Sequence, residues 1–169
     1  MKKTILISIV GLLIAIGAFV FINSKENYDP SKYYLKYDKD KKVLEFALPD
    51  QFNKTHTIKD DTKIVLFAFK KEDGHTIREY LKKNRPSMLD ENHAIFVADI
   101  SKVPSFIRNL VILKDFKKSK FPVVIIYDKN ISAKINDNQN KILVFHLKNK
   151  KITKVEHIKT TDDLKRLLK

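Results

Sequence analysis

The apolar positions of this chain gather in three long runs that are separated by helical patterns. The runs are IVLFAF (64–69), AIFVADI (94–100) and PVVIIYD (122–128), and each is apolar at both alternating positions. Strands that are covered on both faces have this pattern, whereas a half-exposed strand alternates apolar and polar residues. We therefore expect these runs to form buried strands of one sheet between two covering layers.

The segments between these runs have amphipathic periodicity and helix start signals. Thr76 and Glu79 match a T-x-x-E capping box, and Pro104 suits the first turn of a second helix. Apolar residues follow each signal at helical spacing: Ile77, Tyr80 and Leu81 after the first, and Phe106, Ile107, Leu110 and Val111 after the second. The pattern predicts one helix between each pair of strands.

The flanking segments predict hairpins and a final helix. YYLKY and KVLEFAL flank the polar DKDK, and Asn53 provides a residue that tolerates a left-handed turn before the short strand in FNKTHTI. The segment 141–158 predicts a hairpin that turns at 148–151, and TTDDLKRLLK a helix capped by Thr160 and Asp163. The order β-β-(β)-β-α-β-α-β-β-α predicts an α/β fold with a central mixed sheet and helices on both faces.

The N-terminal segment is a candidate for a membrane-spanning helix. Two lysines are followed by an uncharged stretch, and its apolar part, residues 5–22, would span roughly 27 Å as a helix, close to the ~30 Å hydrocarbon core of a bilayer. A cleaved signal peptide is the alternative, but Ile16-Gly17-Ala18 is a poor small-x-small cleavage site and the apolar run continues beyond it. An uncleaved signal anchor therefore fits better.

This interpretation sets the domain boundaries and the location. We expect a signal anchor, transmembrane helix or signal peptide in residues 1–24, a polar tether in 25–32 and one folded domain in 33–169. Lys2 and Lys3 would remain cytoplasmic by the positive-inside tendency. The prediction is a single-pass protein of a bacterial inner membrane, with its domain facing the periplasm or the outside. Cleavage and oligomeric state stay open.

The formal net charge of +14 would suit an anionic partner such as nucleic acid, lipid or an acidic protein. Nucleic acid is disfavoured, because arginine, with its planar fork, is the side chain that best holds phosphate, and only four of the 34 basic residues are arginine. The lysines are scattered and often stand beside acids, as on a solvated surface.

The absence of cysteine excludes disulfides, thiolate catalysis and cysteine-ligated metals from this chain. The five histidines, His56, His75, His93, His146 and His157, fall in no metal-binding spacing, so we expect no metal site. No P-loop or G-x-G-x-x-G motif occurs, so no nucleotide cofactor is expected.

The order of elements and several local strings resemble the thioredoxin-like superfamily, in particular its peroxiredoxin and membrane-tethered thiol-oxidoreductase branch. FALPDQFNKTHTIKDDTKIVLFAF is similar to the entry segment of that branch, and FPVVIIYDKN to its cis-proline strand. The resemblance covers about residues 44–169. It implies a three-layer thioredoxin-like fold and a cis bond between Phe121 and Pro122.

The redox motif of that family is missing here. When Val65 to Phe69 are laid on the family's strand and Arg78-Glu79 on the pair that follows its second cysteine, the Cys-x-x-Cys slot holds Gly74, His75, Thr76 and Ile77. Thiol–disulfide exchange and peroxide reduction both need a thiolate, which this chain cannot supply. The sequence predicts a thioredoxin-like domain without redox function.

The resemblance implies that this corner and the proline loop together form a surface that grips extended polypeptide. That surface would carry Lys70, Lys71, His75, Phe121 and Pro122, a basic rim around an apolar residue. The leading hypothesis is a protein-binding or envelope-assembly module with an unidentified protein partner. Two alternatives stay open: an enzyme that uses His75 with Glu72 or Asp73, and a basic domain that docks on anionic lipid.

Overall fold

The structure is a computed structural model and describes residues 28–169. The predicted anchor, residues 1–24, and the first part of the predicted tether lie outside the described residues. Within 28–169, no helix combines the length and the apolarity that a membrane span requires.

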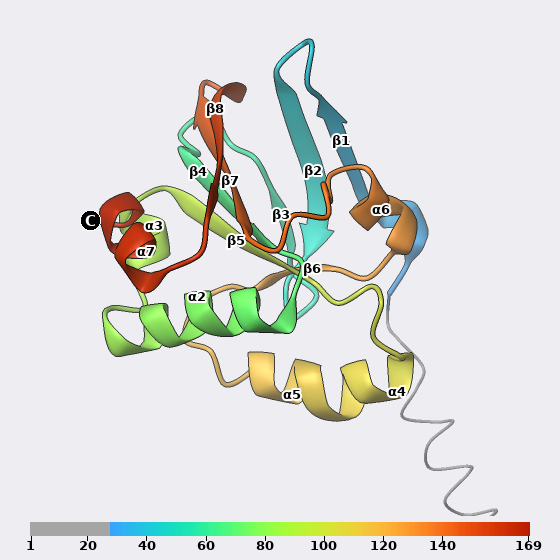
Figure 1. Cartoon of the computed structure of the whole chain (residues 1–169). Helices are drawn as coiled ribbons and strands as arrows, with labels where there is room; N and C mark the ends of the chain where they lie inside the picture. The colour runs from blue at the N-terminus through green and yellow to red at the C-terminus, as the bar shows by residue number, and fades with distance from the viewer. Residues whose placement is uncertain (1–27) are drawn as a thin grey trace, which may run out of the picture.

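The described chain builds one mixed sheet, as the sequence predicted, and it has eight strands where the predicted order had seven (Figure 1). Its strands are β1 (Tyr34–Asp38), β2 (Val43–Pro49), β3 (Thr55–Thr57), β4 (Ile64–Ala68), β5 (Ala94–Asp99), β6 (Val124–Ile126), β7 (Ile142–Lys148) and β8 (Lys151–Ile158). The order is β1-β2-β8-β7-β4-β5-β6, with β3 paired to β2. The three runs predicted to be buried strands form the parallel part, β4-β5-β6, and β7 is antiparallel to β4.

The helices are mostly short. They are α2 (Lys71–Lys83), α3 (Met88–Glu91), α4 (Ser105–Ile107), α5 (Leu113–Phe116), α6 (Lys129–Ala133) and α7 (Thr161–Leu167), with a 3₁₀ turn η1 (Pro30–Lys32) and a π-helical turn η2 (Arg108–Ile112). The elements α4, η2 and α5 follow one another without a break, and together they are called the 105–116 helix below. π-Helical turns inside helices are rare and occur often at functional sites.

The two faces of the sheet are covered by different layers, because successive strand residues point to opposite sides. Leu66, Phe96 and Ile125 belong to a core shared with α2, α3, α5 and α7, whereas Val65 and Phe67 belong to a second core. This second core contains Leu44, Phe46 and Leu48 of the β1–β2 hairpin and Ile131 of α6.

Helices lie on both faces, as predicted, but they are unevenly distributed. Within residues 28–169, one face carries α2, α3, α7 and the 105–116 helix, while the other is covered mainly by the β1–β2 hairpin together with the short α6. The physical reason lies in β2, whose alternate residues Leu44, Phe46 and Leu48 are at most 1% exposed. A hairpin with such a continuous apolar side can cover a sheet as a helix does. In Figure 1, β1 and β2 lie away from α2, α4 and α5.

Several local predictions are confirmed. Asn53 has a left-handed φ of 63° in the turn before β3. Asn149 and Lys150 form the two-residue turn between β7 and β8, both with positive φ. Thr160 and Asp163 form the predicted capping box at α7.

The predicted start of α2 is wrong. The helix begins at Lys71, five residues before the predicted capping box, and the Thr76 hydroxyl donates to the Glu72 carbonyl inside the helix. Glu72 and Asp73 occupy the first turn instead, where the helix dipole favours acidic side chains.

The predicted cis bond between Phe121 and Pro122 is also wrong, because the described residues contain no cis peptide. The buried side chain of Gln51 explains the extended course of this segment. Its Nε2 donates to the Phe121 carbonyl at 2.9 Å, and its Oε1 accepts from the Val123 amide at 2.8 Å. Gln51 thus pairs with residues 121 and 123 as a neighbouring strand would.

Candidate functional site

A groove lies at the corner where β4 leads into α2. It is a cavity of about 360 Å³ between the start of α2, the end of β5 and the 105–116 helix, and it is called the corner groove below. Its lining residues are Ala68, Phe69, Lys70, Lys71, Gly74, His75, Arg78, Ala98, Asp99, Ile100, Lys102, Val103, Val111, Ile112, Asp115 and Phe116. An apolar floor with a few polar groups at the rim is the usual composition of a ligand pocket.

The structure brings four of the predicted site residues together here. Lys70, Lys71, Gly74 and His75 all line the corner groove. Of the rest of the predicted Cys-x-x-Cys slot, Thr76 is half-buried and Ile77 is fully buried in the core. Of the four residues in this slot, Gly74 and His75 therefore line the groove. Ile77 instead packs in the core between α2 and the sheet.

Phe121 and Pro122 do not belong to this groove. Phe121 is 3% exposed and packs in the core on the helix side of the sheet, so its ring is not available at a surface. Pro122 lines a different hollow. The apolar component of the groove comes instead from the 105–116 helix, through Val111 and Ile112.

Arg78 holds the two helices that form the walls of the groove. Its guanidinium donates to the Asp115 carboxylate at 2.7 Å and to the Asp115 carbonyl at 3.3 Å, and it lies 4.9 Å from the centre of the Phe116 ring. The hydrogen bond from Arg78 holds the pKa of Asp115 below its ordinary value. Sequence analysis matched Arg78 to the family pattern but assigned it no role, since Asp115 is 37 residues away.

The carboxylates of the groove are already engaged, while its lysines are not. Asp99 accepts from the Ser101 amide and the Ser132 hydroxyl, and Asp115 is paired with Arg78. In contrast, among residues 28–169 no carboxylate lies within ion-pair distance of Lys70, Lys71 or Lys102. The groove therefore presents an apolar floor surrounded by lysines that form no ion pair within residues 28–169.

Gly74 sits where α2 approaches β4 most closely. A Cβ at this position would lie 3.8 Å from the Ala68 Cβ, which is an ordinary contact, and its φ is not positive. We expect Gly74→Ala to raise the free energy of unfolding by about 1 kcal/mol, because alanine is the better helix former. Chemical unfolding followed by far-UV circular dichroism measures this effect. A loss of stability would show that the packing of α2 on β4 requires glycine.

Asp73, in the same turn, is buried and does not line the groove. It is 8% exposed, and its Oδ2 has no hydrogen-bond partner within the described part of the chain. Burial raises the pKa of Asp73, and neighbouring Glu72 adds to this, while Lys70 and Lys159 act in the opposite direction. The folded state therefore binds a proton at Asp73 more tightly than the unfolded chain does.

Because the pKa of Asp73 is raised in the folded state, we predict that the charge of Asp73 lowers the free energy of unfolding at neutral pH. Asp73→Asn should raise the free energy of unfolding at pH 7 by about 1 kcal/mol, the order of cost of a buried polar group without a partner. The gain should fall as pH drops through the raised pKa and vanish below the ordinary value of 3.8. Unfolding curves from pH 3 to 7 test this, with the exposed Asp162→Asn as control. A pH-independent gain would contradict the titration of Asp73 as its cause.

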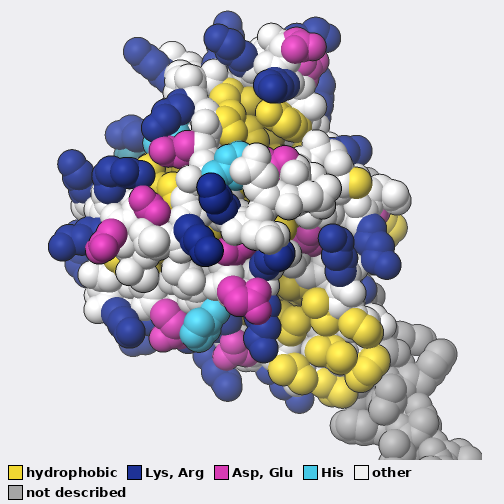
Figure 2. All heavy atoms as spheres, viewed as in Figure 1, with side chains coloured by type: hydrophobic (Ala, Val, Ile, Leu, Met, Phe, Trp, Pro, Cys, Tyr) yellow, Lys and Arg dark blue, Asp and Glu magenta, His cyan; other side chains and the backbone are white. Residues whose placement is uncertain are grey.

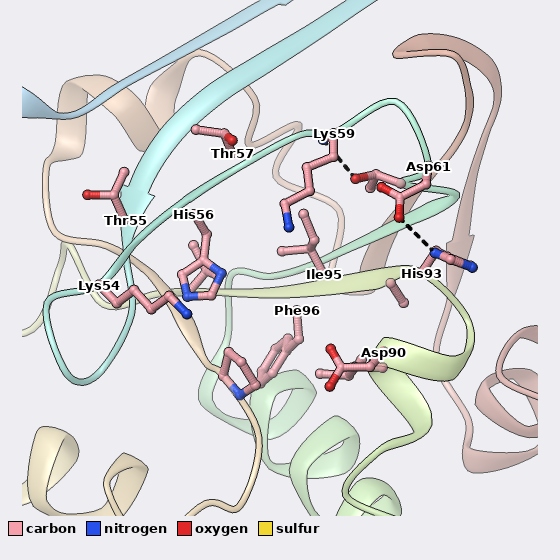
Figure 3. A pocket seen from close by; sticks show the side chains of 15 residues that line it. Lys54, Thr55, His56, Thr57, Lys59, Asp61, Asp90, His93, Ile95 and Phe96 are labelled. Atoms are coloured by element: carbon pink, nitrogen blue, oxygen red, sulfur yellow. Dashed lines mark hydrogen bonds and ion pairs between the residues drawn. The ribbon is translucent and has the colours of Figure 1, made fainter.

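A second hollow, of about 670 Å³, lies along β3 and the start of β5 (Figure 3). Its ionisable groups are mixed in sign, and two of them form pairs with carboxylates: His56 with Asp50 at 2.9 Å, and His93 with Asp61 at 3.2 Å. Figure 3 shows the rings of His56 and His93 on opposite sides of this hollow. The groups do not converge on one point as the groups of a catalytic or ligand site do.

The described residues form neither a metal-binding group nor a catalytic base that is oriented by a carboxylate. Among residues 28–169, no three His, Asp or Glu side chains are grouped so that they could hold a metal ion. In the same part of the chain, His75 forms no hydrogen bond with Glu72 or Asp73, and the buried Asp73 does not line the corner groove.

The comparisons with known proteins agree on the fold. No family model matches the chain, and no curated protein matches it significantly in sequence. Among solved structures, StoA from Bacillus subtilis matches with a TM-score of 0.50 at 14% identity, covering 74% of this chain and 96% of StoA. Peroxidoxin BcpB from Mycobacterium tuberculosis matches with 0.48 at 16% identity, covering 80% and 94%.

A putative thiol:disulfide interchange protein DsbE from Chlorobium tepidum matches with a TM-score of 0.47 at 14% identity, covering 78% of this chain and 96% of that one. Of these three, the StoA match reaches a TM-score of 0.50, and at such low identity it defines the fold alone. The protein has a thioredoxin-like fold, and its 169 residues contain no cysteine. Thiol–disulfide exchange therefore cannot take place on this chain.

Proposed function

We propose that this protein is a membrane-anchored, redox-inactive thioredoxin-like domain that binds a protein partner through the corner groove. The anchor is the apolar segment of residues 5–22, and the domain faces the outside of a bacterial inner membrane. A role in an envelope assembly fits a domain that is held at the membrane and carries no thiol chemistry.

The observation that carries this proposal is the combination of an apolar floor and lysines without ion pairs in the corner groove. Ala68, Ala98 and Ile100 form part of the lining, and Lys70, Lys71 and Lys102 stand at its rim. Such a site complements an extended, acidic segment of polypeptide that places one apolar side chain in the groove. Charge complementarity would speed the encounter, and the apolar contact would hold the complex.

The non-thiol enzyme alternative receives less support. General base catalysis needs a base within hydrogen-bond reach of its orienting group and its substrate. His75 lacks such an orienting carboxylate in the described part of the chain, and the buried Asp73 lies outside the groove lining. Binding is therefore the function that this corner supports best.

Site-specific photo-crosslinking in intact cells tests the proposal. The full chain carries a photoreactive benzoylphenylalanine at His75, or at the exposed Val155 of β8 as a control. We expect a discrete protein adduct from position 75 only, and we expect Lys70→Glu with Lys71→Glu to remove it. A matched pair, Lys36→Glu with Lys39→Glu on and beside β1, changes the charge equally and should leave the adduct intact.

The adduct also tests the chemistry of the partner. Its crosslinked segment, mapped by mass spectrometry, should contain acidic residues next to an apolar one. No adduct at position 75, or an adduct that survives reversal of Lys70 and Lys71, would overturn the assignment of the groove as the binding site.

A further inference from the structure

The 105–116 helix exposes large apolar side chains. Phe106 is 45% and Val111 60% exposed, and Ile107 and Leu110 are only half-buried. Of its apolar residues only Phe116 is buried in the core. Figure 2 shows an apolar area at the lower right of the molecule, over the position of α4 in Figure 1. Exposed apolar patches of this kind mark surfaces that contact another molecule or a membrane.

The same helix lies in a strongly basic part of the domain. Residues 102–120 contain six basic residues and a single acid, Asp115. Five of the six, Lys102, Lys114, Lys117, Lys118 and Lys120, are exposed. A helix that combines exposed Phe and Val with surrounding lysines matches the composition of helices that lie in the interface of an anionic bilayer.

The entry of the chain into the domain lies beside this helix. The ring of Tyr28, the first described residue, packs against the ring of Tyr127 at a tilt of 37°, with 4.9 Å between ring centres. Arg108, in the π-helical turn of the 105–116 helix, donates to the Tyr127 carbonyl at 3.0 Å, and its guanidinium lies 5.7 Å from the centre of the same ring. Tyr28 and the 105–116 helix therefore meet at one residue, Tyr127.

The length of chain before Tyr28 limits how far this helix can be from a membrane. Ile22 is the last residue of the apolar N-terminal segment, and Tyr28 follows it only six positions later along the chain. Six residues extend over at most about 20 Å. An anchored domain would thus keep the 105–116 helix close to the bilayer, where lysines feel the negative surface potential of anionic lipids.

We propose that the 105–116 helix docks on the anionic phospholipid surface of the membrane that anchors the chain. Phe106 and Val111 enter the boundary between headgroups and acyl chains, and the surrounding lysines contact lipid phosphate. The proposal rests on the membrane anchor of the proposed function. It deepens that function, because Val111 and Ile112 also line the corner groove. Docking would place the groove at the membrane surface, next to the membrane-proximal segment of a partner.

The cysteine-free chain permits a direct test. Single-cysteine variants of the full chain, Phe106→Cys, Val111→Cys and Val155→Cys, are labelled with the environment-sensitive fluorophore NBD. Val155, on β8, is 42% exposed and so matches Phe106 as a control far from the helix. Each variant is reconstituted in vesicles of phosphatidylcholine with phosphatidylglycerol, or of phosphatidylcholine alone. Circular dichroism checks that each variant is folded.

We expect NBD at positions 106 and 111 to show a several-fold higher, blue-shifted emission in the anionic vesicles, with a weaker change in neutral vesicles. The emission of NBD at position 155 should remain that of a water-exposed label in both kinds of vesicle. Equal emission at all three positions would overturn the proposal, whether all are buried or all are in water.

Flotation of the same samples distinguishes a failure of the membrane anchor from a failure of helix docking. If the protein floats with vesicles but positions 106 and 111 remain in water, the anchor is supported and the docking of the 105–116 helix is overturned. A chain that does not float with any vesicle overturns both the anchor and the docking.

Discussion

Phe67→Ala is expected to lower the free energy of unfolding by about 4 kcal/mol, within the usual range for a buried phenylalanine. Phe67 of β4 is fully buried, and its ring centre lies 5.8 Å from that of Phe145 and 6.4 Å from that of Phe46, both edge-on. Because Phe46 belongs to β2, this cluster joins the central sheet to the hairpin that covers it. Removal of the ring leaves a cavity between two layers that can collapse only partly.

Chemical unfolding followed by far-UV circular dichroism measures this loss. Phe52→Ala is the control, since Phe52 is 62% exposed and its truncation should change stability by less than about 0.5 kcal/mol. A loss below about 1.5 kcal/mol for Phe67→Ala would be too small for a fully buried ring. That result would show that the β1–β2 hairpin does not close this core.

Gln51→Leu should cost about 3 kcal/mol, although leucine is similar in size and more apolar. The substitution leaves the Phe121 carbonyl and the Val123 amide without their partner in a buried place, and each such group costs about 1–3 kcal/mol. The same change at the exposed Gln139 should be nearly neutral. Unfolding curves of the two variants provide the comparison. A nearly neutral Gln51→Leu would mean that the segment around Pro122 finds other hydrogen-bond partners.

The buried strands and the hairpins were predictable because their signals are local. Apolar residues at both alternating positions of 64–69 can be satisfied only by a strand covered on both sides. Asn53 and the Thr160–Asp163 pair carry their own backbone preferences, so they adopt the predicted turn and cap.

The start of α2 was not predictable from its strongest local signal. The Thr76–Glu79 pattern resembles a cap, but Gly74 and Ala68 pack together only if the helix already exists at Gly74. Helix boundaries depend on such packing as well as on propensity, and here packing extends the helix by a turn and more.

The candidate site depends even more on contacts between distant segments. Phe121 follows a series of lysines and so resembles a surface residue, yet the core on the helix side of the sheet encloses it. Conversely, Val111 has the helical spacing of a core residue and is 60% exposed. In both cases the periodicity of the segment indicates which side chains share a face, but only the neighbouring elements decide whether that face is covered.

The sequence by itself determined what chemistry this protein lacks: without a cysteine, no thiolate can form at the corner between β4 and α2, whatever the fold. It also determined the buried strands and the apolar N-terminal segment, since both follow from composition over a short window. Only the tertiary structure decided what surrounds that corner. Arg78 and Asp115 join α2 to the 105–116 helix across 37 residues, and the groove exists because these two helices meet.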